Sequence, residues 1–408
     1  MKVTQIYDFL NSLTEEVLGK TDLAVKNLTD MISMGDEVLS SDKTTDKFVN
    51  VLVDRISKTI ISNKPYSASV KKFMVDSFTF GAILQKIYVE PMKSSKSDTW
   101  DLQNEKSVDQ YVISKPTVKQ KLFSGITTWD VKVTIPDVQL RSAFNNETSM
   151  ATFIDAIFTA MLNSIELRIE SMVNMTICNF MANKIAHYKT AEGGSLGVVN
   201  LLTEYNTLKG LETQLTAEVA LRDSDFLKYA SDTINKYIKR MERMSTLFND
   251  EEYQRFTTAD RLRVILHLDF ESAFTTFLES DTFHNELVKL PLHDTVPYWQ
   301  GSGKDYSFAE SSYIGLTTSN GKYTVEQTGI VGLIADVESI GVTIYDRRTK
   351  SAYNAGGEYT NYFNKADIGY YNDMSENGVV FIIADEVSEV VVNVPNDWGE
   401  IIPPIEYN

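Results

Sequence analysis

The longest regular pattern in the chain covers residues 149–189, where about forty residues pass without Gly or Pro. Apolar residues recur at helical spacing along one stripe: Ile154, Phe158, Met161, Ile165, Ile169, Met172, Ile177 and Phe180. Polar residues follow the opposite stripe: Asp155, Thr159, Asn163, Glu166, Glu170 and Asn174. This period predicts one helix roughly 60 Å long, capped by Thr148 or Ser149 and ending before Gly193–Gly194. Because the stripe drifts instead of keeping strict heptads, we expect a spine that packs along a sheet, and not a coiled coil.

The pattern changes between Phe73 and Leu140, where β-branched and aromatic residues alternate with polar ones. Segment 108–123 is typical of an extended strand and segment 127–136 of its return, with a turn near Ser124–Gly125. A long two-stranded finger cannot bury both of its faces, and an isolated hairpin is marginally stable in water. We therefore expect this finger to lie on another subunit.

The remaining segments include both the helical spacing and the alternation that is typical of strands. Residues 1–45 contain short amphipathic stretches, which indicate an arm that lies on something else, and a helix is predicted over 47–62, capped by Asp46. Further helices are predicted within 201–215 and 223–248, a strand followed by a helix within 261–280, and strands within 331–346, 358–371 and 378–394. Because helical and strand segments are interspersed, the predicted fold class is α+β.

Composition narrows the classes of protein. The 408 residues carry a formal net charge of −17, with no basic footprint of the kind that strong nucleic-acid binding requires. The chain has no apolar run of membrane-spanning length and no secretory signal, so no membrane partner is predicted. The single Cys178 excludes an internal disulfide, and its place on the long helix predicts a buried structural thiol.

No catalytic motif, cofactor site or metal site is predicted. Segment 300–306 (QGSGKDY) lacks the first Gly and the Ser or Thr of a phosphate-binding loop, so it is interpreted as a surface turn. The four histidines, His187, His267, His284 and His293, form no zinc motif. The aromatic-rich segment 359–373 favours a protein contact surface over a carbohydrate or base platform. Together these observations indicate a structural, self-assembling protein and not an enzyme.

Five segments carry a resemblance to a known family: FVNVLVDRISKTII, IYVEPM, TTWDVKVTIPDVQLRSAF, TSMATFIDAIFTAMLNSIEL and VGLIADVESIGVTIYDRRTKSAYNAGGEYTNYFN. They resemble the corresponding segments in the head proteins of small-genome podophages. These are major capsid proteins of tailed bacteriophages, which share the Hong Kong ninety-seven fold. The likeness covers roughly residues 46–395 and rests on the pattern and order of elements.

The resemblance implies a division of the chain into six parts. These are an N-terminal arm (1–45), an N-terminal helix with the entry to the peripheral domain (46–83), an extended loop (84–140), the spine helix of the peripheral domain (141–194), an axial domain with peripheral strands near 262–300 (195–385), and the last peripheral strand with the tail (386–408). It also implies that the extended loop lies over a neighbouring subunit and that the polar stripe of the spine helix faces the shell lumen or a neighbour. No immunoglobulin-like decoration is expected after Asn408, and retention of Met1 argues against removal of an N-terminal scaffolding segment.

The function implied is that of a capsid protein that forms pentamers and hexamers of an icosahedral phage head around double-stranded DNA. The implied partners are other copies of the chain, a portal protein, a scaffolding protein and DNA held by non-specific contact, with assembly in the bacterial cytoplasm and residence in the virion. The candidate assembly residues are Trp100, Tyr111, Lys121, Phe123, Trp129, Glu166, Glu170, Gly356, Gly357, Tyr359 and Tyr362. Crosslinking through Lys93, Lys96 or Asn361 is not predicted. Two alternatives stay open: the shell of an encapsulin-like cellular compartment, and a soluble enzyme of unknown chemistry.

Overall fold

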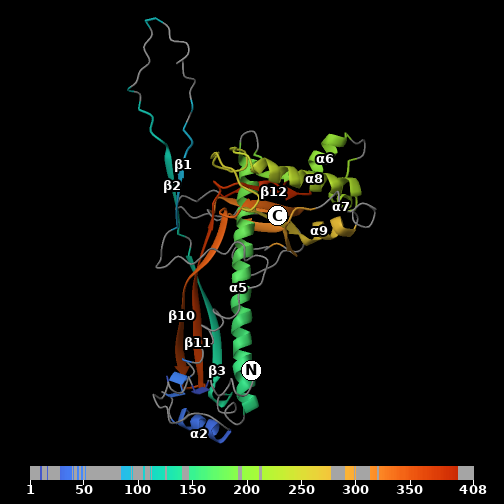
Figure 1. Cartoon of the computed structure of the whole chain (residues 1–408). Helices are drawn as coiled ribbons and strands as arrows, with labels where there is room; N and C mark the ends of the chain where they lie inside the picture. The colour runs from blue at the N-terminus through green and yellow to red at the C-terminus, as the bar shows by residue number, and fades with distance from the viewer. Residues whose placement is uncertain are drawn as a thin grey trace. The chain divides into compact units, whose positions relative to one another are not determined.

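A computed structural model shows the arrangement of the chain (Figure 1). It describes isolated positions up to residue 111 and the ranges 28–38, 84–92, 113–124, 126–139, 147–191, 195–210, 214–276, 290–297, 299, 313–318 and 321–393. Between 147 and 167 only the backbone is described, apart from Ser164. The chain divides into two compact units. The first comprises Met1–Phe80, Ile126–Val173 and Val342–Gly369, and the second comprises Gly81–Gly125, Asn174–Gly341 and Tyr370–Asn408.

The first unit is built on a three-stranded antiparallel sheet in the order β10-β11-β3. The strands are β3 (Ile126–Pro136), β10 (Ile340–Asn354) and β11 (Tyr359–Asn372), and β10 and β11 extend at one end into the second unit. Along β3, exposed and more buried residues alternate, as expected for a strand with one covered face. This unit also contains helix α2 (Leu28–Val38).

The predicted pairing between segments 108–123 and 127–136 is wrong. Strand β2 (Val118–Phe123) pairs antiparallel with β1 (Leu84–Val89), and β3 pairs instead with β11. The register of β3 with β11 runs unbroken from Ile126 opposite Gly369 to Pro136 opposite Tyr359, whereas β2 has only six residues to offer a partner. The turn signal near residue 124 predicted a change of direction, but it carries no information on which distant segment supplies the matching edge.

The long helix is present as α5 (Glu147–Thr190), a single element of 44 residues. This confirms the helix predicted for 149–189. The predicted caps are wrong, because the helix begins at Glu147 and Thr148 and Ser149 lie inside its first turn. Residues 192–194 lie outside the described part of the chain.

The prediction that α5 keeps a polar stripe along its length is wrong for its later turns. From Ser171 to Ala186 every residue is buried except the half-buried Asn179 and Asn183. Asn174, assigned to the polar stripe, is buried, as is Cys178, which confirms the predicted buried thiol. A helix buried on all sides needs no amphipathic pattern, so a solvent-facing stripe cannot be inferred from polar residues alone.

The second unit is built on a five-stranded mixed sheet in the order β4-β12-β9-β5-β6. Its strands are β4 (Val198–Asn200), β5 (Leu262–His267), β6 (Asp294–Val296), β9 (Ile330–Asp336) and β12 (Gly378–Ile382). The central pairings β12–β9 and β9–β5 are antiparallel, and the outer pairings β12–β4 and β5–β6 are parallel. Strand β9 is buried at every position, as is typical of a central strand.

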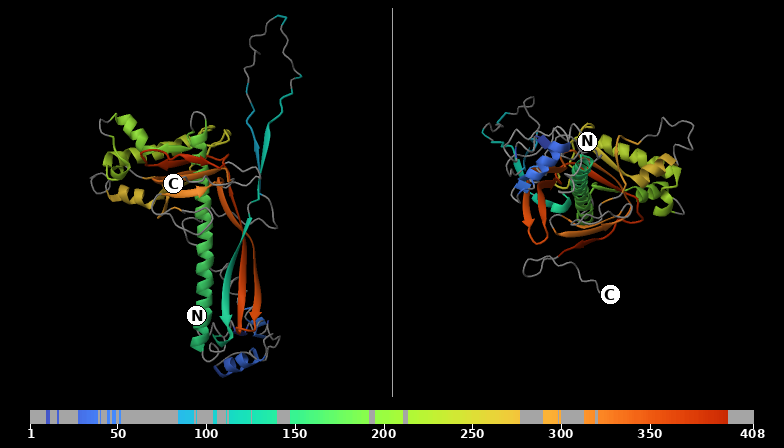
Figure 2. Two further views of the ribbon diagram at one scale, coloured as in Figure 1. Left: turned by 180° about the vertical axis from the view of Figure 1, so that it is seen from behind. Right: turned by 90° about the horizontal axis from the view of Figure 1, so that it is seen from below.

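Besides the part of α5 from Asn174 onward, the described residues of this unit form the helices α6 (Leu201–Lys209), α7 (Ala217–Ala220), α8 (Ser224–Met241) and α9 (Leu268–Phe274). Figure 2 shows this group in yellow-green and yellow beside the orange and red strands. Their apolar residues join those of β5, β9 and β12 in one core. Helix α8 is capped by Asp223, whose carboxylate accepts from the Phe226 N–H at 2.7 Å, and it ends at Met241, before the end predicted for the 223–248 segment.

Two smaller sheets complete the second unit. One is the hairpin of β1 and β2, and the other has the order β13-β8-β7, with β7 (Ile314–Thr317), β8 (Tyr323–Gln327) and β13 (Val390–Val392). The helices and strands confirm the predicted α+β class. The helix predicted for 47–62 lies outside the described residues, apart from positions 47, 48 and 51.

Candidate functional site

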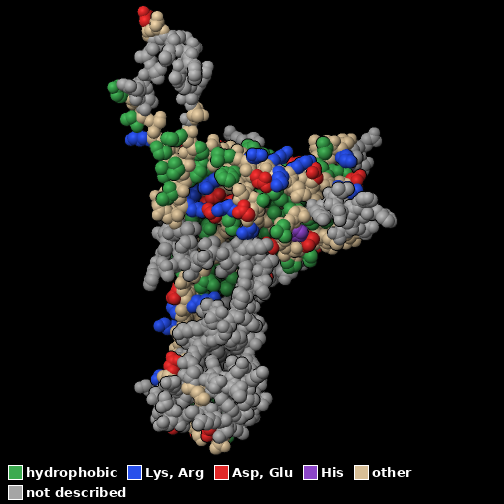
Figure 3. Space-filling view, viewed as in Figure 1, with side chains coloured by type: hydrophobic (Ala, Val, Ile, Leu, Met, Phe, Trp, Pro, Cys, Tyr) green, Lys and Arg blue, Asp and Glu red, His purple; other side chains and the backbone are tan. Residues whose placement is uncertain are grey.

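The hairpin of β1 and β2 has its polar face covered and its apolar face exposed. Along both strands the half-buried positions alternate with exposed ones. The half-buried face carries Lys86, Tyr88, Lys119, Lys121 and Phe123. The opposite face carries four exposed aliphatic side chains: Ile87 (64%), Val89 (52%), Val118 (58%) and Leu122 (57%). Hydrophobic side chains gather over this part of the molecule in Figure 3. This orientation is the reverse of that found when a sheet buries its apolar side within its own chain.

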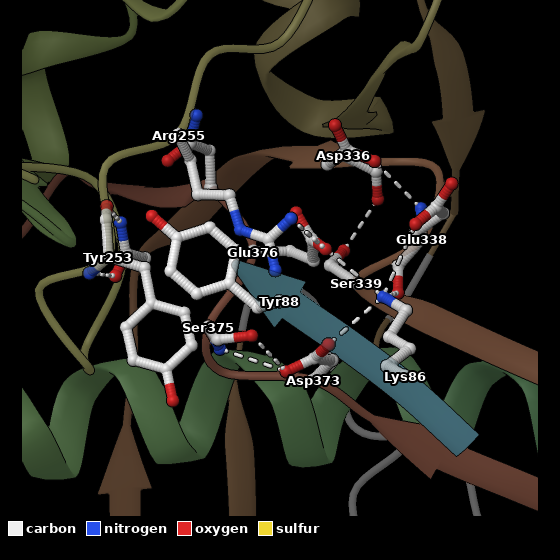
Figure 4. Close-up of polar contacts among 12 residues, drawn as sticks. Lys86, Tyr88, Tyr253, Arg255, Asp336, Glu338, Ser339, Asp373, Ser375 and Glu376 are labelled. Carbon is white, nitrogen blue, oxygen red and sulfur yellow. Dashed lines mark hydrogen bonds and ion pairs between the residues drawn. The ribbon is translucent and has the colours of Figure 1, made fainter. Parts of the chain in front are cut away.

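The covered face is held by a group of ion pairs that we call the root cluster: Lys86, Lys121, Glu251, Arg255, Asp373 and Glu376. The Nζ of Lys86 lies 2.9 Å from Asp373 Oδ2 and 3.1 Å from Glu376 Oε1. The Nζ of Lys121 lies 3.0 Å from Asp373 Oδ1 and also contacts Glu251. Figure 4 shows Lys86 reaching from β1 toward Asp373 and Glu376. Two neighbouring strands of the hairpin are thus joined to one buried carboxylate.

A tight turn between β11 and β12 presents that carboxylate. The Oδ1 of Asp373 accepts from the Ser375 N–H at 3.0 Å and from the Ser375 hydroxyl at 2.7 Å (Figure 4). The Asp373 N–H donates to the Ser339 carbonyl at 2.7 Å. Asp followed by Ser two residues on is a common turn sequence, because the Asp side chain bonds the backbone ahead of it. The sequence DMSEN therefore folds locally into the turn that places Asp373 and Glu376 side by side.

The charged groups of the root cluster shift one another's pKa values. Burial opposes ionisation of Asp373, but Lys86, Ser375 and Lys121 outweigh it and hold the pKa of Asp373 at about 2. Burial also opposes the charge on Lys86, and Asp373 and Glu376 outweigh it, so the pKa of Lys86 is raised. For Glu376 burial prevails over Lys86 and Arg255, and its pKa is raised. Asp373 is therefore the carboxylate that fixes both lysines, because it has two cations and two hydrogen-bond donors.

Aromatic rings extend the root cluster along the hairpin. Tyr88 of β1 stacks on Tyr253 with ring centroids 4.6 Å apart, and the Arg255 guanidinium lies 4.7 Å from the Tyr88 ring. Asn249 holds the loop that carries Tyr253, accepting from its N–H at 2.7 Å and donating to its carbonyl at 2.7 Å. Arg255 also pairs with Glu376 at 3.2 Å. The hairpin root is consequently fixed by both charge and stacking.

The geometry of this site favours attachment over catalysis. The acidic groups Asp373, Glu376 and Glu251 each face a lysine or arginine. No group of three or more His, Cys, Asp or Glu residues able to hold a metal ion occurs in the described part of the chain. Within that part, no helix is long and apolar enough to cross a membrane. The arrangement can fix the root of a hairpin whose apolar face stays exposed.

The structure brings two of the predicted assembly residues to this site. Lys121 belongs to the root cluster, and the Phe123 ring lies 5.1 Å from that of Tyr371. Tyr111 is 81% exposed, while Trp100 lies outside the described residues.

The other predicted assembly residues lie in the first unit. Trp129 lies on β3 beneath Arg168, and Glu170 is half-buried on α5, where the side chain of Glu166 is not described. Gly356 and Gly357 form the β10–β11 turn, where both N–H groups donate to Asn354 Oδ1. Tyr359 accepts from the Asn354 amide at 2.9 Å, and Tyr362 is fully buried. The role of each of these residues in assembly stays a prediction.

The residues considered for chemistry are also placed. His267 is buried and caps α9, with Nδ1 accepting from the Asp269 N–H, as expected for a structural histidine. His187 lies 3.6 Å from Asp250, and His293 lies 3.4 Å from Glu271. Among the possible crosslinking residues, Asn361 accepts from Thr134 Oγ1 at 2.7 Å. His284, the segment 300–306, Lys93 and Lys96 lie outside the described residues.

Sequence reasoning missed the centre of the site. Lys86, Asp373, Glu376 and Arg255 were not among the predicted residues. The available signals were lysines at alternate positions of a predicted strand, opposite to its aliphatic residues, and the Asp-x-Ser-Glu turn after a strand. Neither signal shows that the two segments, separated by more than 280 residues, meet.

Comparison with known proteins identifies the family. The sequence matches the model of the Phi29-like phage major capsid protein family over residues 10–382, and the chain belongs to this family of structural capsid proteins. The major capsid protein of Bacillus phage GA-1 is 21% identical over 398 residues, covering 96% of this chain and 73% of that protein. The major capsid protein of Bacillus phage B103 is 24% identical over 182 residues, covering 44% of this chain and 39% of that protein. The predicted tailed-phage capsid class is thereby confirmed, and the encapsulin-like and enzyme alternatives are not favoured.

Two solved structures from bacteriophages contain a chain that is similar to this one. A chain from the capsid of Staphylococcus phage Andhra has a TM-score of 0.48 and 10% identity, covering 76% of this chain and 83% of that one. A chain from the structure of the head fiber and inner core protein gp22 of native bacteriophage P68 has a TM-score of 0.49 and 10% identity. The match covers 77% of this chain and 84% of that one. The match to the family model is the finding that assigns the chain to its family.

Proposed function

We propose that copies of this chain form the pentamers and hexamers of an icosahedral phage head that encloses double-stranded DNA. Membership of the Phi29-like family supports the capsid role. The observation that carries the assembly proposal is the inverted hairpin, with charged groups underneath and four aliphatic side chains exposed. Each Å² of apolar surface that is removed from water stabilises the buried state by about 25 cal/mol. A neighbouring copy that covers this face therefore supplies the burial that the single chain lacks.

The unpaired edges of the hairpin support the same proposal. Among the described strands, β1 pairs only with β2, so each has one free edge of backbone donors and acceptors. Free edges attract further strands, and a two-stranded hairpin is marginal alone. The root cluster fixes the hairpin at one end and leaves the exposed face of Ile87, Val89, Val118 and Leu122 available to a second copy.

The experiment places a charge on that face. Ile87→Asp and Leu122→Asp are expected to abolish shell formation while the unassembled chain keeps its far-ultraviolet circular dichroism and its melting temperature. The matched control is Leu208→Asp on α6, whose side chain is 70% exposed. Shells are counted by sedimentation velocity and electron microscopy. Wild-type yields of shells from both hairpin variants, or an equal loss in the control, would contradict the proposal.

The remaining parts of the proposal concern the division of the chain and its partners. The proposed boundaries of the arm, extended loop, spine and axial segments are those predicted from the sequence, and the proposed fold is of the Hong Kong ninety-seven type. A portal protein and a scaffolding protein take part in assembly in the bacterial cytoplasm, and the mature product resides in the virion. Co-expression with each candidate partner, followed by particle imaging, tests this part separately.

DNA is proposed as a non-specific partner. The formal net charge of −17 is unfavourable for tight binding to a phosphate backbone, and an acidic lumen wall lets packaged DNA slide. Purified empty shells are expected to bind short duplex DNA weakly, with an affinity that does not depend on its sequence. Tight, sequence-selective binding at physiological salt would contradict this part.

A further inference from the structure

A small cavity in the first unit is lined by apolar side chains, two arginines and one asparagine. Its volume is about 20 Å³, and its lining comes from β3, α5, β10 and β11: Trp129, Val131, Arg168, Ile169, Ile344, Arg347, Asn364, Ala366 and Ile368. A space of this size holds one water-sized species. Two half-buried cations and an indole N–H border this space, and water alone cannot balance their charge.

Arg347 enters this cavity without a counter-charge. No ion pair joins its guanidinium to a carboxylate of the described residues, and burial lowers its pKa. The adjacent Arg348 differs: it donates to Asp367 Oδ1 at 3.1 Å and also pairs with Asp346. Arg347 and Arg348 are successive residues of β10, so their side chains lie on opposite faces of the strand. Of the two guanidinium groups, only that of Arg348 is paired with a described carboxylate. An unpaired charge moved out of water is costly unless an opposite charge accompanies it.

Two further groups at the cavity lack an acceptor. The Nε1–H of Trp129 is buried and has no hydrogen-bond partner within the described part of the chain. The Arg168 guanidinium lies 4.6 Å from the centre of the Trp129 ring, and it too forms no ion pair with a described carboxylate. The nearby carboxylate of Asp367 is already engaged by Arg348 and by Thr128 at 2.6 Å. The cavity therefore concentrates donors and positive charge, and an acceptor with negative charge would satisfy them together.

We propose that this cavity binds one small negatively charged group, either a halide ion or one oxygen atom of a carboxylate, beside Arg347, Arg168 and the Trp129 N–H. The negatively charged group can come from either of two sources: a free anion in solution, or an acidic side chain of a second copy of the chain. The cavity residues belong to the first unit and the hairpin face to the second, so different substitutions test the two proposals.

Bromide is the probe, because it is a monatomic anion and can be located by anomalous scattering. The melting temperature of the unassembled chain is measured in sodium bromide and in sodium gluconate of equal ionic strength, since gluconate is too bulky to enter. The wild type is expected to melt at a higher temperature in bromide, with a saturable dependence on its concentration. Arg347→Met should lose this dependence and melt in gluconate no lower than the wild type, and Trp129→Phe should weaken the apparent affinity about tenfold, as for loss of one charged hydrogen bond.

Arg348→Met is the matched control, because it removes the neighbouring guanidinium that already has its own carboxylate. It is expected to keep the full bromide dependence, whatever its effect on stability. The proposal is overturned if the wild type shows no saturable difference between bromide and gluconate, or if Arg347→Met responds to bromide as the wild type does. Water alone in the cavity at saturating bromide would overturn it as well.

The two sources are distinguished in assembled particles. A free anion predicts an anomalous bromide signal beside Arg347 both in shells and in the unassembled chain. A carboxylate from a second copy predicts density for that side chain in shells, a bromide effect confined to the unassembled chain, and impaired assembly of Arg347→Met. Because shell formation by Ile87→Asp tests the hairpin face separately, failure of one proposal leaves the other standing.

Discussion

The root cluster and the core of the five-stranded sheet both belong to the second unit, but they are stabilised by different forces. The core is made of fully buried apolar side chains such as Phe226, Leu266 and Phe381, supplied by helices and strands together. The root cluster is made of lysines and carboxylates, with the Asp373 side chain fully buried and that of Lys86 17% exposed. The stabilisation from buried apolar side chains depends neither on pH nor on the orientation of the groups. The stabilisation from an ion pair depends on both.

The difference shows how a capsid subunit can hold a protruding element without burying its apolar side. If aliphatic residues anchored the hairpin, the face available to a neighbour would be polar. Anchoring through Lys86 and Lys121 instead leaves Ile87 and Leu122 on the outside, since alternate residues of a strand face opposite ways. The cost is that the anchor weakens when its carboxylate is protonated.

The largest expected effect comes from the core. Phe226→Ala removes a fully buried ring that lies edge-on to Tyr205, with centroids 5.4 Å apart, and should lower the free energy of unfolding by about 3–5 kcal/mol. Urea unfolding of the unassembled chain measures it, and the loss should be the same at pH 7 and pH 4. The control Leu208→Ala, at an exposed site, should stay within about 0.5 kcal/mol. If the loss of unfolding free energy in Phe226→Ala depended strongly on pH, the contrast drawn between the apolar core and the root cluster would be wrong.

An intermediate effect is expected at the root cluster. The pKa of Asp373 is about 2 in the folded chain against an ordinary 3.8, which corresponds to about 2 kcal/mol of stability. Because the folded value is the lower one, this contribution is complete above about pH 4 and is lost as the pH falls toward 2. Asp373→Asn should therefore be less stable than the wild type at pH 7, and the gap should close with acid.

Hydrogen exchange of the β1 and β2 amides is the readout for Asp373→Asn, since it reports opening of the hairpin root without global unfolding. The matched control is Asp232→Asn, which breaks the exposed pair of Asp232 with Lys236 and should change stability by less than about 0.5 kcal/mol. A gap between Asp373→Asn and the wild type that stayed constant from pH 7 to pH 3 would show that the ion pairs do not hold the hairpin.

The smallest effect is expected at Ser375. Ser375→Ala removes the hydroxyl that donates to Asp373 at 2.7 Å but keeps the backbone N–H bond at 3.0 Å. The loss should be about 1 kcal/mol, and the pKa of Asp373 should rise toward its usual value because one donor is gone. Titration of the Asp373 carboxyl by NMR checks the second result. An unchanged pKa would show that the lysines alone set it.

Several elements could be predicted from the sequence because their signals are local. The span of α5 follows from a long stretch free of Gly and Pro, and β9, β11 and β12 follow from runs of β-branched and aromatic residues bounded by turn residues. The α+β class and the capsid family also follow from the order of these elements. The chemistry of the root cluster could not be predicted, since Lys86 and Asp373 are far apart in the chain and each has an ordinary local context.

Local sequence patterns are enough to show which segments are helical or extended and that the hairpin segment has an aliphatic and a charged side. The fold as a whole sets the pairing of β2 with β1 in place of β3, the burial of most of α5 between Ser171 and Ala186, and the covering of the charged side of the hairpin. The physical reason is that periodicity is imposed by the backbone within a few residues. The partner of an edge and the burial of a face depend instead on which distant segments supply matching hydrogen bonds and opposite charges.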